Sequence, residues 1–248
     1  MTIRRIGLGW IAALVAAGGC QGREPRMTNQ IAGEQIEDAI KQGDAAALRR
    51  LLEADPARAS TPLAGGLTPL LLALYHQRKD LVHLVREHCG DLGWFEAAAV
   101  GSAQRLKQRL AEDAEQINAH AADGWTALHL AAYFAQPNAV QVLIDAGANP
   151  DAVARSAARI RPIHSAAAGR NAEVARLLLQ AGADVNAVHQ GGWTALQASS
   201  KFGDLDVVRV LLAHGADARQ ATENGQTALD FAADHPKVLA LLRSNPSD

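Results

Sequence analysis

The chain has 248 residues, of which 48% are hydrophobic, so it is long enough to bury a sizeable core. Aromatic residues make up only 4% of it, which predicts a core of small and aliphatic side chains. The 24 lysine and arginine residues nearly balance the 26 aspartate and glutamate residues. A formal charge of -2 provides no overall attraction for nucleic acid, and we expect no nucleic-acid partner.

The N-terminal residues have the layout of an export signal. Arg4 and Arg5 are followed by an apolar run from Ile6 to Ala17 and then by small residues before Cys20. The run has about twelve residues, fewer than the roughly twenty that a permanent membrane-spanning helix needs. We therefore predict a signal peptide over residues 1–19.

The sequence Ala17-Gly18-Gly19-Cys20 resembles a bacterial lipoprotein cleavage box. The resemblance implies that Cys20 is lipidated and that the protein lies in the periplasm, held at a bacterial membrane by its lipid anchor. Residues 20–32 are polar overall and lack apolar periodicity, so we expect a flexible tether there. Two alternatives stay open: a signal that is not processed as in a lipoprotein, or translation from Met27, which would give a cytosolic chain.

Residues 33–244 alternate between helical runs and breaks. The first three units are weakly patterned and cover residues 33–63, 64–90 and 91–119. In the second unit, Thr68-Pro69-Leu70 precedes a helical run, and in the third, Ala98-Ala99 lies 33 residues before Ala131-Ala132. Thr68 and Thr126 are 58 residues apart, less than two periods of 33, which predicts a shortened connection near residues 89–93.

Three well-matched units follow over residues 122–153, 157–187 and 190–220, and a C-terminal cap over 223–244 precedes the tail 245–248. The first of them predicts a helix from about Thr126 to Phe134, a break at Gln136-Pro137, a second helix from about Asn138 to Ala146 and a stop at Gly147. The same pattern returns every 33 to 35 residues, with Arg161, Thr194 and Thr227 at the place of Thr126. Such a period predicts stacked repeats.

The residue types in this pattern suit stacked pairs of helices. The Thr126 hydroxyl can cap the first helix, and the small Ala131-Ala132 pair lets neighbouring helices approach closely. Gly147 permits the left-handed turn that ends the second helix. Because one unit is too small to bury a core alone, its stability must come from its neighbours.

The repeated segments are TALHLAA at 126–132, PIHSAAA at 162–168, TALQASS at 194–200 and TALDFAA at 227–233, followed in the first three units by GANPDA, GADVNA and GADARQ. They resemble the ankyrin repeat. The resemblance implies an all-α fold, an ankyrin-repeat α-solenoid of about six to seven helix-turn-helix repeats with short β-hairpin-like turns.

No catalytic motif in the sequence indicates a reaction. The chain contains no nucleophile elbow, phosphate-binding loop or zinc-protease motif, and no cysteine or carboxylate lies at zinc spacing from its nine histidines. The resemblance implies that His129 and His164 hydrogen-bond within and between turns. We therefore expect no enzymatic activity, no cofactor and no metal; an enzyme, the opposing interpretation, would have to use His76 or His83.

The resemblance also implies a concave binding surface made of hairpin tips and the exposed ends of first helices. Two interpretations of the aromatic side chains there stay open: contact with a partner, or packing between adjacent repeats. The residues that we expect to contact a partner are Tyr75, His76, His120, Trp125, Tyr133, Phe134, Arg155, Arg159, Trp193, Lys201 and Phe202.

These features together predict a monomeric, non-enzymatic scaffold of the bacterial cell envelope that binds a protein partner. A narrower alternative is a periplasmic immunity or inhibitor protein directed against a toxin. The third candidate is a cytosolic ankyrin adaptor that starts at Met27.

Overall fold

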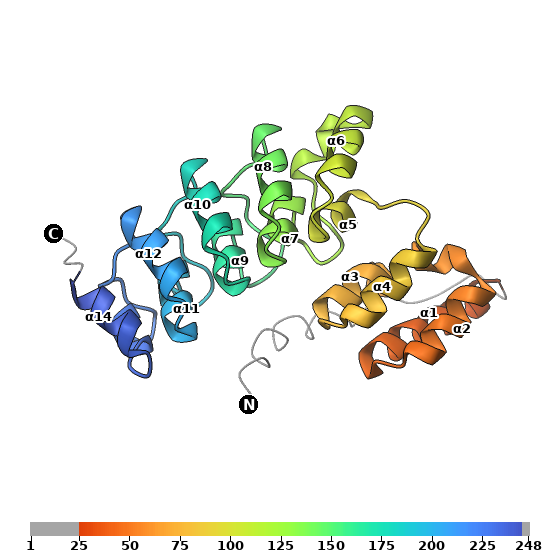
Figure 1. Ribbon diagram of the computed structural model, residues 1–248, viewed down its shortest axis with the longest axis horizontal. Coiled ribbons are helices and arrows are strands. Elements are labelled where there is room, and N and C mark those ends of the chain that lie inside the picture. The colour runs from red at the N-terminus through yellow and green to blue at the C-terminus, as the bar shows by residue number, and fades with distance from the viewer. Residues whose placement is uncertain (1–24, 245–248) are drawn as a thin grey trace. The chain divides into compact units, whose positions relative to one another are not determined.

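The computed structural model describes residues 25–244, and nothing but helices and loops occurs in this part of the chain. The predicted signal peptide 1–19, the lipidation candidate Cys20 and the tail 245–248 lie outside the described residues. The chain forms two compact units, with the boundary between Glu96 and Ala97. Figure 1 shows the helices of both units.

The N-terminal unit contains two helix pairs. Its elements are α1 (Pro25–Gln42), α2 (Ala45–Ala54), the 3-10 helix η1 (Pro56–Ala59), α3 (Pro69–Tyr75), α4 (Lys79–His88) and the start of α5 (Trp94–Ala99). Helix α1 packs on α3 and α2 packs on α4, through apolar faces that bury Ile40, Leu48, Leu70 and Leu81 completely. Thr68 caps α3, since its hydroxyl accepts the amide of Leu71, and the same hydroxyl donates to Glu96 at 2.7 Å.

One expectation for this unit was wrong. Residues 25–32 of the predicted tether are the first turns of α1, and the remainder of the tether lies outside the described residues. Pro25 can occupy the first turn of a helix, and no further proline interrupts the chain before Gln42. The helix therefore begins well before its first apolar-periodic residue.

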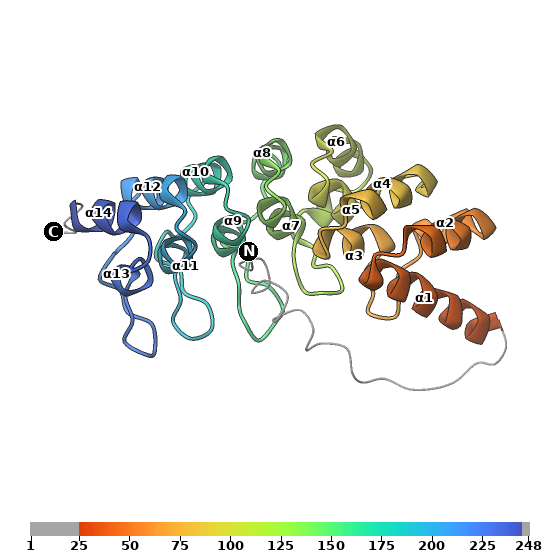
Figure 2. The same cartoon turned by 60° about the horizontal axis from the view of Figure 1, so that its bottom comes forward.

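The second unit begins within α5 and continues through five helix pairs. Its other elements are α6 (Ala103–Glu112), the 3-10 helix η2 (Ala114–Asn118), α7 (Ala127–Tyr133), α8 (Pro137–Asp145), α9 (Pro162–Ala168), α10 (Ala172–Gln180), α11 (Ala195–Phe202), α12 (Leu205–Ala213), α13 (Ala228–Phe231) and α14 (Pro236–Ser244). The first helices α7, α9, α11 and α13 pack side by side in one row, and the second helices α6, α8, α10, α12 and α14 form another. Figure 2 shows the loops before α9, α11 and α13 projecting in the same direction from the first-helix row.

Small residues allow this stacking. Ala131 and Ala132 of α7, like Ala166 and Ala167 of α9, are at most 1% exposed. Thr126 caps α7 as predicted, because its hydroxyl accepts the amide of His129. The hairpin-like turns are reduced to isolated antiparallel bridges, which the described residues show between His120 and Thr126 and between His189 and Trp193.

The connection between the second and third repeats is short, as the 58-residue spacing predicted. Helix α4 ends at His88 and α5 begins at Trp94, so only residues 89–93 join them. Cys89, in this link, is half-buried, and its thiol donates to the carbonyl oxygen of Ala59 at 3.4 Å. Burial raises the pKa of this thiol, which makes it less reactive than a free cysteine.

A left-handed residue occurs at the break between the two helices of six repeats. Glycine fills this position at Gly43, Gly101 and Gly203, with φ of 77°, 77° and 69°. Side-chain-bearing residues fill it at Gln77, Ala135 and Arg170, with φ of 55°, 56° and 57°. The repeat geometry therefore imposes a backbone conformation that three of these residues adopt at some energetic cost.

Candidate functional site

The loops before the first helices are joined to one another by main-chain hydrogen bonds. The amide of Arg155 donates to the carbonyl of Gly124 at 2.8 Å, that of Gln190 to Ala158 at 3.0 Å, and that of Glu223 to Gly191 at 3.0 Å. At Gly124, φ is +82° and a Cβ atom would lie 2.6 Å from the carbonyl oxygen of Arg155, so only glycine fits. Successive loop tips are thus held at a fixed spacing.

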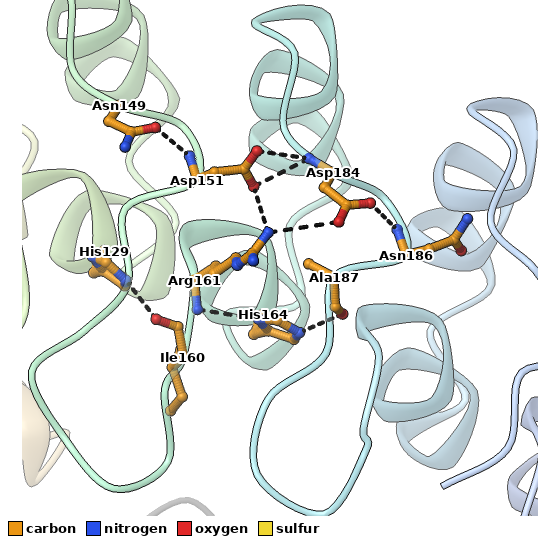
Figure 3. Close-up of polar contacts among 9 residues, drawn as sticks. All are labelled: His129, Asn149, Asp151, Ile160, Arg161, His164, Asp184, Asn186 and Ala187. Carbon is orange, nitrogen blue, oxygen red and sulfur yellow. Dashed lines mark hydrogen bonds and ion pairs between the residues drawn. The ribbon is translucent and has the colours of Figure 1, made fainter.

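A histidine or glutamine in each well-matched repeat links its first helix to the next loop. Nδ1 of His129 accepts the amide of Thr126 at 3.3 Å, and its Nε2 donates to the carbonyl of Ile160 at 3.0 Å. His164 repeats this arrangement with the amide of Arg161 and the carbonyl of Ala187 (Figure 3). In the repeat that follows, the side-chain amide of Gln197 replaces the imidazole. Its oxygen accepts the backbone amide of Thr194 at 2.8 Å, and its nitrogen donates to the backbone carbonyl of Gln220 at 2.7 Å.

Burial keeps both imidazoles neutral. It lowers the pKa of His129 to about 4 and that of His164 to about 3, where the nearby His189 adds a smaller lowering. The hydrogen bonds to backbone carbonyls oppose this shift without overcoming it. The predicted structural role of both residues is confirmed, and each links two repeats.

A second series of hydrogen bonds joins the starts of these loops, just after the second helices, from one repeat to the next (Figure 3). Asn118 accepts the amide of Asn149, Asp151 accepts that of Asp184, and Asn186 accepts that of Asp217, at 2.8 to 3.1 Å. Arg161 lies between two of these acids, 3.4 Å from Asp151 and 3.6 Å from Asp184. Its charge is therefore balanced within the array, unlike those of Arg155 and Arg159, for which no ion pair occurs among the described residues.

Two groups of aromatic rings lie along the first-helix row. In the first, Trp125 meets the ring of Tyr133 edge to face at 5.4 Å, and Tyr133 meets Phe134 at 5.1 Å. In the second, Trp193 stacks on Phe231 with ring centroids 4.4 Å apart. The ammonium of Lys201 lies 5.1 Å from the centre of the Trp193 ring and 5.8 Å from that of Phe231, within cation–π range.

The model of the family described as ankyrin repeats, in three copies, matches residues 36–189 and again residues 163–248. This chain belongs to the ankyrin repeat family. Ankyrin repeats generally mediate protein–protein interactions and are generally non-catalytic, and stacked repeats of this kind offer extended binding surfaces.

Several curated proteins resemble parts of the array. Ankyrin repeat domain-containing protein SAT10 of Stachybotrys chartarum is 32% identical over 165 residues, which are 65% of this chain and 8% of that protein. BCL-6 corepressor-like protein 1 of Homo sapiens is 31% identical over 117 residues, 47% of this chain and 6% of that protein. Probable E3 ubiquitin-protein ligase XBOS33 of Oryza sativa subsp. japonica is 32% identical over 122 residues, 45% of this chain and 24% of that protein. The chain thus spans less than a quarter of the length of each of these relatives.

The ankyrin array separates the predicted contact residues into buried and accessible ones. Trp125 is 9% exposed and Tyr75 is 4% exposed, which favours packing over partner contact for both rings. Lys201, Arg155 and Arg159 are exposed. The remaining candidates are partly buried, namely His76, His120, Tyr133, Phe134, Trp193 and Phe202.

The two histidines among the predicted contact residues, His120 and His76, interact with neighbouring parts of the array. Nε2 of His120 is 3.2 Å from the carbonyl oxygen of Val153, in the next ankyrin loop. The pKa of His76 is lowered, by burial first and then by the charges of Lys41 and Arg78. Within residues 25–244 no group of three or more histidine, cysteine or acidic side chains is placed to hold a metal ion. No described helix has the length and apolar character to cross a membrane.

Two accessible residues were not among the predicted contacts. Phe231 takes the place that buried Leu130 has three repeats earlier in the row, an exchange of apolar types that carries no signal of exposure in the sequence. Val188, at the tip of the loop before α11, is 45% exposed and is the one large hydrophobic side chain so exposed among the described residues. Its place in the hairpin, directly before the polar residues His189 and Gln190, could have been a signal.

Proposed function

We propose that this ankyrin array is a non-enzymatic scaffold that binds a protein partner at the bacterial cell envelope. The observation that carries the proposal is the Trp193 ring, which is partly accessible and is flanked by the ring of Phe231 and the ammonium of Lys201. Aromatic side chains that lose little conformational freedom on binding are favoured anchors of protein interfaces. Loop tips fixed by hydrogen bonds reduce the entropy lost on binding further.

The binding surface can be tested by capture from bacterial envelope fractions on the tagged full-length chain. We expect a specific protein to be retained by the wild-type chain and to be lost from Tyr133→Ala and Lys201→Ala variants. Arg209→Ala removes an exposed arginine from the second-helix row and is the matched control. Equal retention by all variants would show that the first-helix face is not the one used, and no retained protein would contradict the scaffold function.

The envelope location rests on the export-signal layout and on Cys20. Radiolabelled palmitate should enter the wild-type chain but not a Cys20→Ser variant. An unlabelled wild-type product with the mass of the unprocessed chain, or of a chain that starts at Met27, would refute the lipid anchor. In the second case the protein would be a cytosolic adaptor.

A further inference from the structure

Charge is distributed unevenly along the first-helix face of the second unit. The hairpin and first helix of two successive repeats, residues 152–169 and 187–203, contain no aspartate or glutamate. The corresponding segments on either side, residues 119–134 and 220–235, contain acidic residues but no lysine or arginine. A positive stretch two repeats long is therefore bounded by negative charge at both ends.

The cations of this stretch are available to a ligand. Arg155, Arg159 and Lys201 are exposed, and no carboxylate pairs with any of them among the described residues. Some arginines of the second unit are paired, such as Arg170 with Asp204 at 2.6 Å and Arg109 with Glu112 at 3.0 Å. Exposed cations also lie on the second helices, for example Arg209 of α12 and Lys237 of α14, but these helices carry acidic residues or lie away from Trp193. What distinguishes the stretch with Arg155, Arg159 and Lys201 is that its hairpins and first helices contain no carboxylate.

The structure holds these groups next to one another. The loop with Arg155 and Arg159 is joined to the following loop by the hydrogen bond from Gln190 to Ala158. That following loop carries exposed Val188 and leads directly into Trp193, over which Lys201 lies. We call the set Arg155, Arg159, Val188, Trp193 and Lys201 the basic–aromatic surface.

We propose that the basic–aromatic surface binds an acidic segment of the protein partner, with carboxylates toward the cations and an apolar or aromatic side chain against Trp193 and Val188. The proposal rests on the proposed function and names the chemistry of its partner. Helices that pack at about 8–10 Å give two repeats a width of about 20 Å, which an extended peptide of about six residues spans. Basic residues outside this short acidic stretch would lie near Asp123 on one side and Glu223 on the other.

The test is selection of random dodecapeptides displayed on phage against the immobilised full-length chain. We expect the enriched sequences to share a short acidic stretch with an aromatic or aliphatic residue. Enrichment of basic or of purely apolar sequences, or no enrichment, would overturn the proposal. The capture experiment would still be able to support a protein partner bound elsewhere, so the two failures are distinguishable.

The affinity of a selected peptide then tests the residues. Arg155→Glu/Arg159→Glu should weaken binding by about tenfold or more at low salt and by less at roughly 0.5 M NaCl. Arg209→Glu/Lys237→Glu makes the same charge change on the second-helix row and should alter affinity less than about twofold. Equal losses in both double variants would refute a local site. An oligothymidylate bound more tightly than the peptides would assign the surface to nucleic acid instead.

Discussion

His164 of α9 donates a hydrogen bond from Nε2 to the carbonyl oxygen of Ala187 at 2.9 Å, in the loop that leads into the next repeat. The opposite nitrogen of the same ring accepts the amide of Arg161. The ring can fill both roles only while it is neutral, because a protonated imidazole has no acceptor. The same holds for His129, between Thr126 and Ile160.

This arrangement predicts that acid destabilises the array. The unfolded chain binds protons on both histidines near the ordinary pKa of 6.5, whereas the folded chain binds them only near 4 for His129 and 3 for His164. The stability is therefore complete above pH 6.5 and is lost as the pH falls, by at most about 1.4 kcal/mol per pH unit for each histidine. Chemical unfolding followed by circular dichroism at pH 7.5 and pH 5 measures the loss.

The chain itself suggests the control, since Gln197 makes the same two contacts without a titrating group. A His129→Gln/His164→Gln variant should fold and should lose about 2–4 kcal/mol less than the wild type between the two pH values. Parallel losses in both proteins would assign the acid sensitivity to other groups.

Gly124→Ala should destabilise the array more than Gly147→Ala. Both glycines have a positive φ, which costs a non-glycine residue about 1–2 kcal/mol. Nothing lies within 4 Å of a Cβ at Gly147, whereas a Cβ at Gly124 would collide with the carbonyl oxygen of Arg155 at 2.6 Å. Thermal melting of the two variants compares them, and equal melting temperatures would argue against tight contact between the loop tips.

Ser199→Ala/Ser200→Ala should stabilise the protein by about 1–2 kcal/mol. Both hydroxyls are buried without a hydrogen-bond partner among the described residues, in the positions where α7 has Ala131 and Ala132. Urea unfolding measures the gain. Ser244→Ala, at an exposed hydroxyl near the end of α14, should change the midpoint little; a loss of stability in the double variant would mean that the hydroxyls are satisfied in solution.

Ala135→Gly should stabilise the protein by about 0.5–1 kcal/mol, because Ala135 has a φ of 56° at a position where three other repeats have glycine. Ala240→Gly places glycine in an exposed part of α14 instead and should destabilise by about 1 kcal/mol. Calorimetry distinguishes the two directions. A shift of the same sign in both variants would mean that Ala135 is not strained.

The repeated sequence predicted stacked repeats and the Thr126 cap, because the period identifies equivalent backbone positions, and the resemblance to the ankyrin repeat implied the role of His129. It could not predict which aromatic rings are covered. Trp125 and Trp193 occupy the same position, but the first is buried against Tyr133 while the second shares its exposed side with Lys201. A ring's exposure depends on the size of the residues around it, which vary from repeat to repeat.

The left-handed conformation of Gln77, Ala135 and Arg170 could not be predicted from the sequence either. These residue types carry no local signal for a positive φ, and the stacking of the helices imposes it. The extent of α1 was missed for the opposite reason, since nothing in residues 26–32 prevents a helix, although the apolar pattern begins only later. Pattern identifies buried faces more reliably than it identifies helix ends.

The side-chain contacts from Asn118 to Asp217 have a consequence for engineering. Asp151 and Asn186 accept the backbone amides of Asp184 and Asp217 in the next repeat, so successive repeats are joined by nearly the same hydrogen bond. We expect that a segment that starts after Asp151 and ends at Asp184 can be duplicated or removed with equivalent hydrogen bonds re-formed at both of its ends. Natural lengthening or shortening of this gene could follow the same cut points.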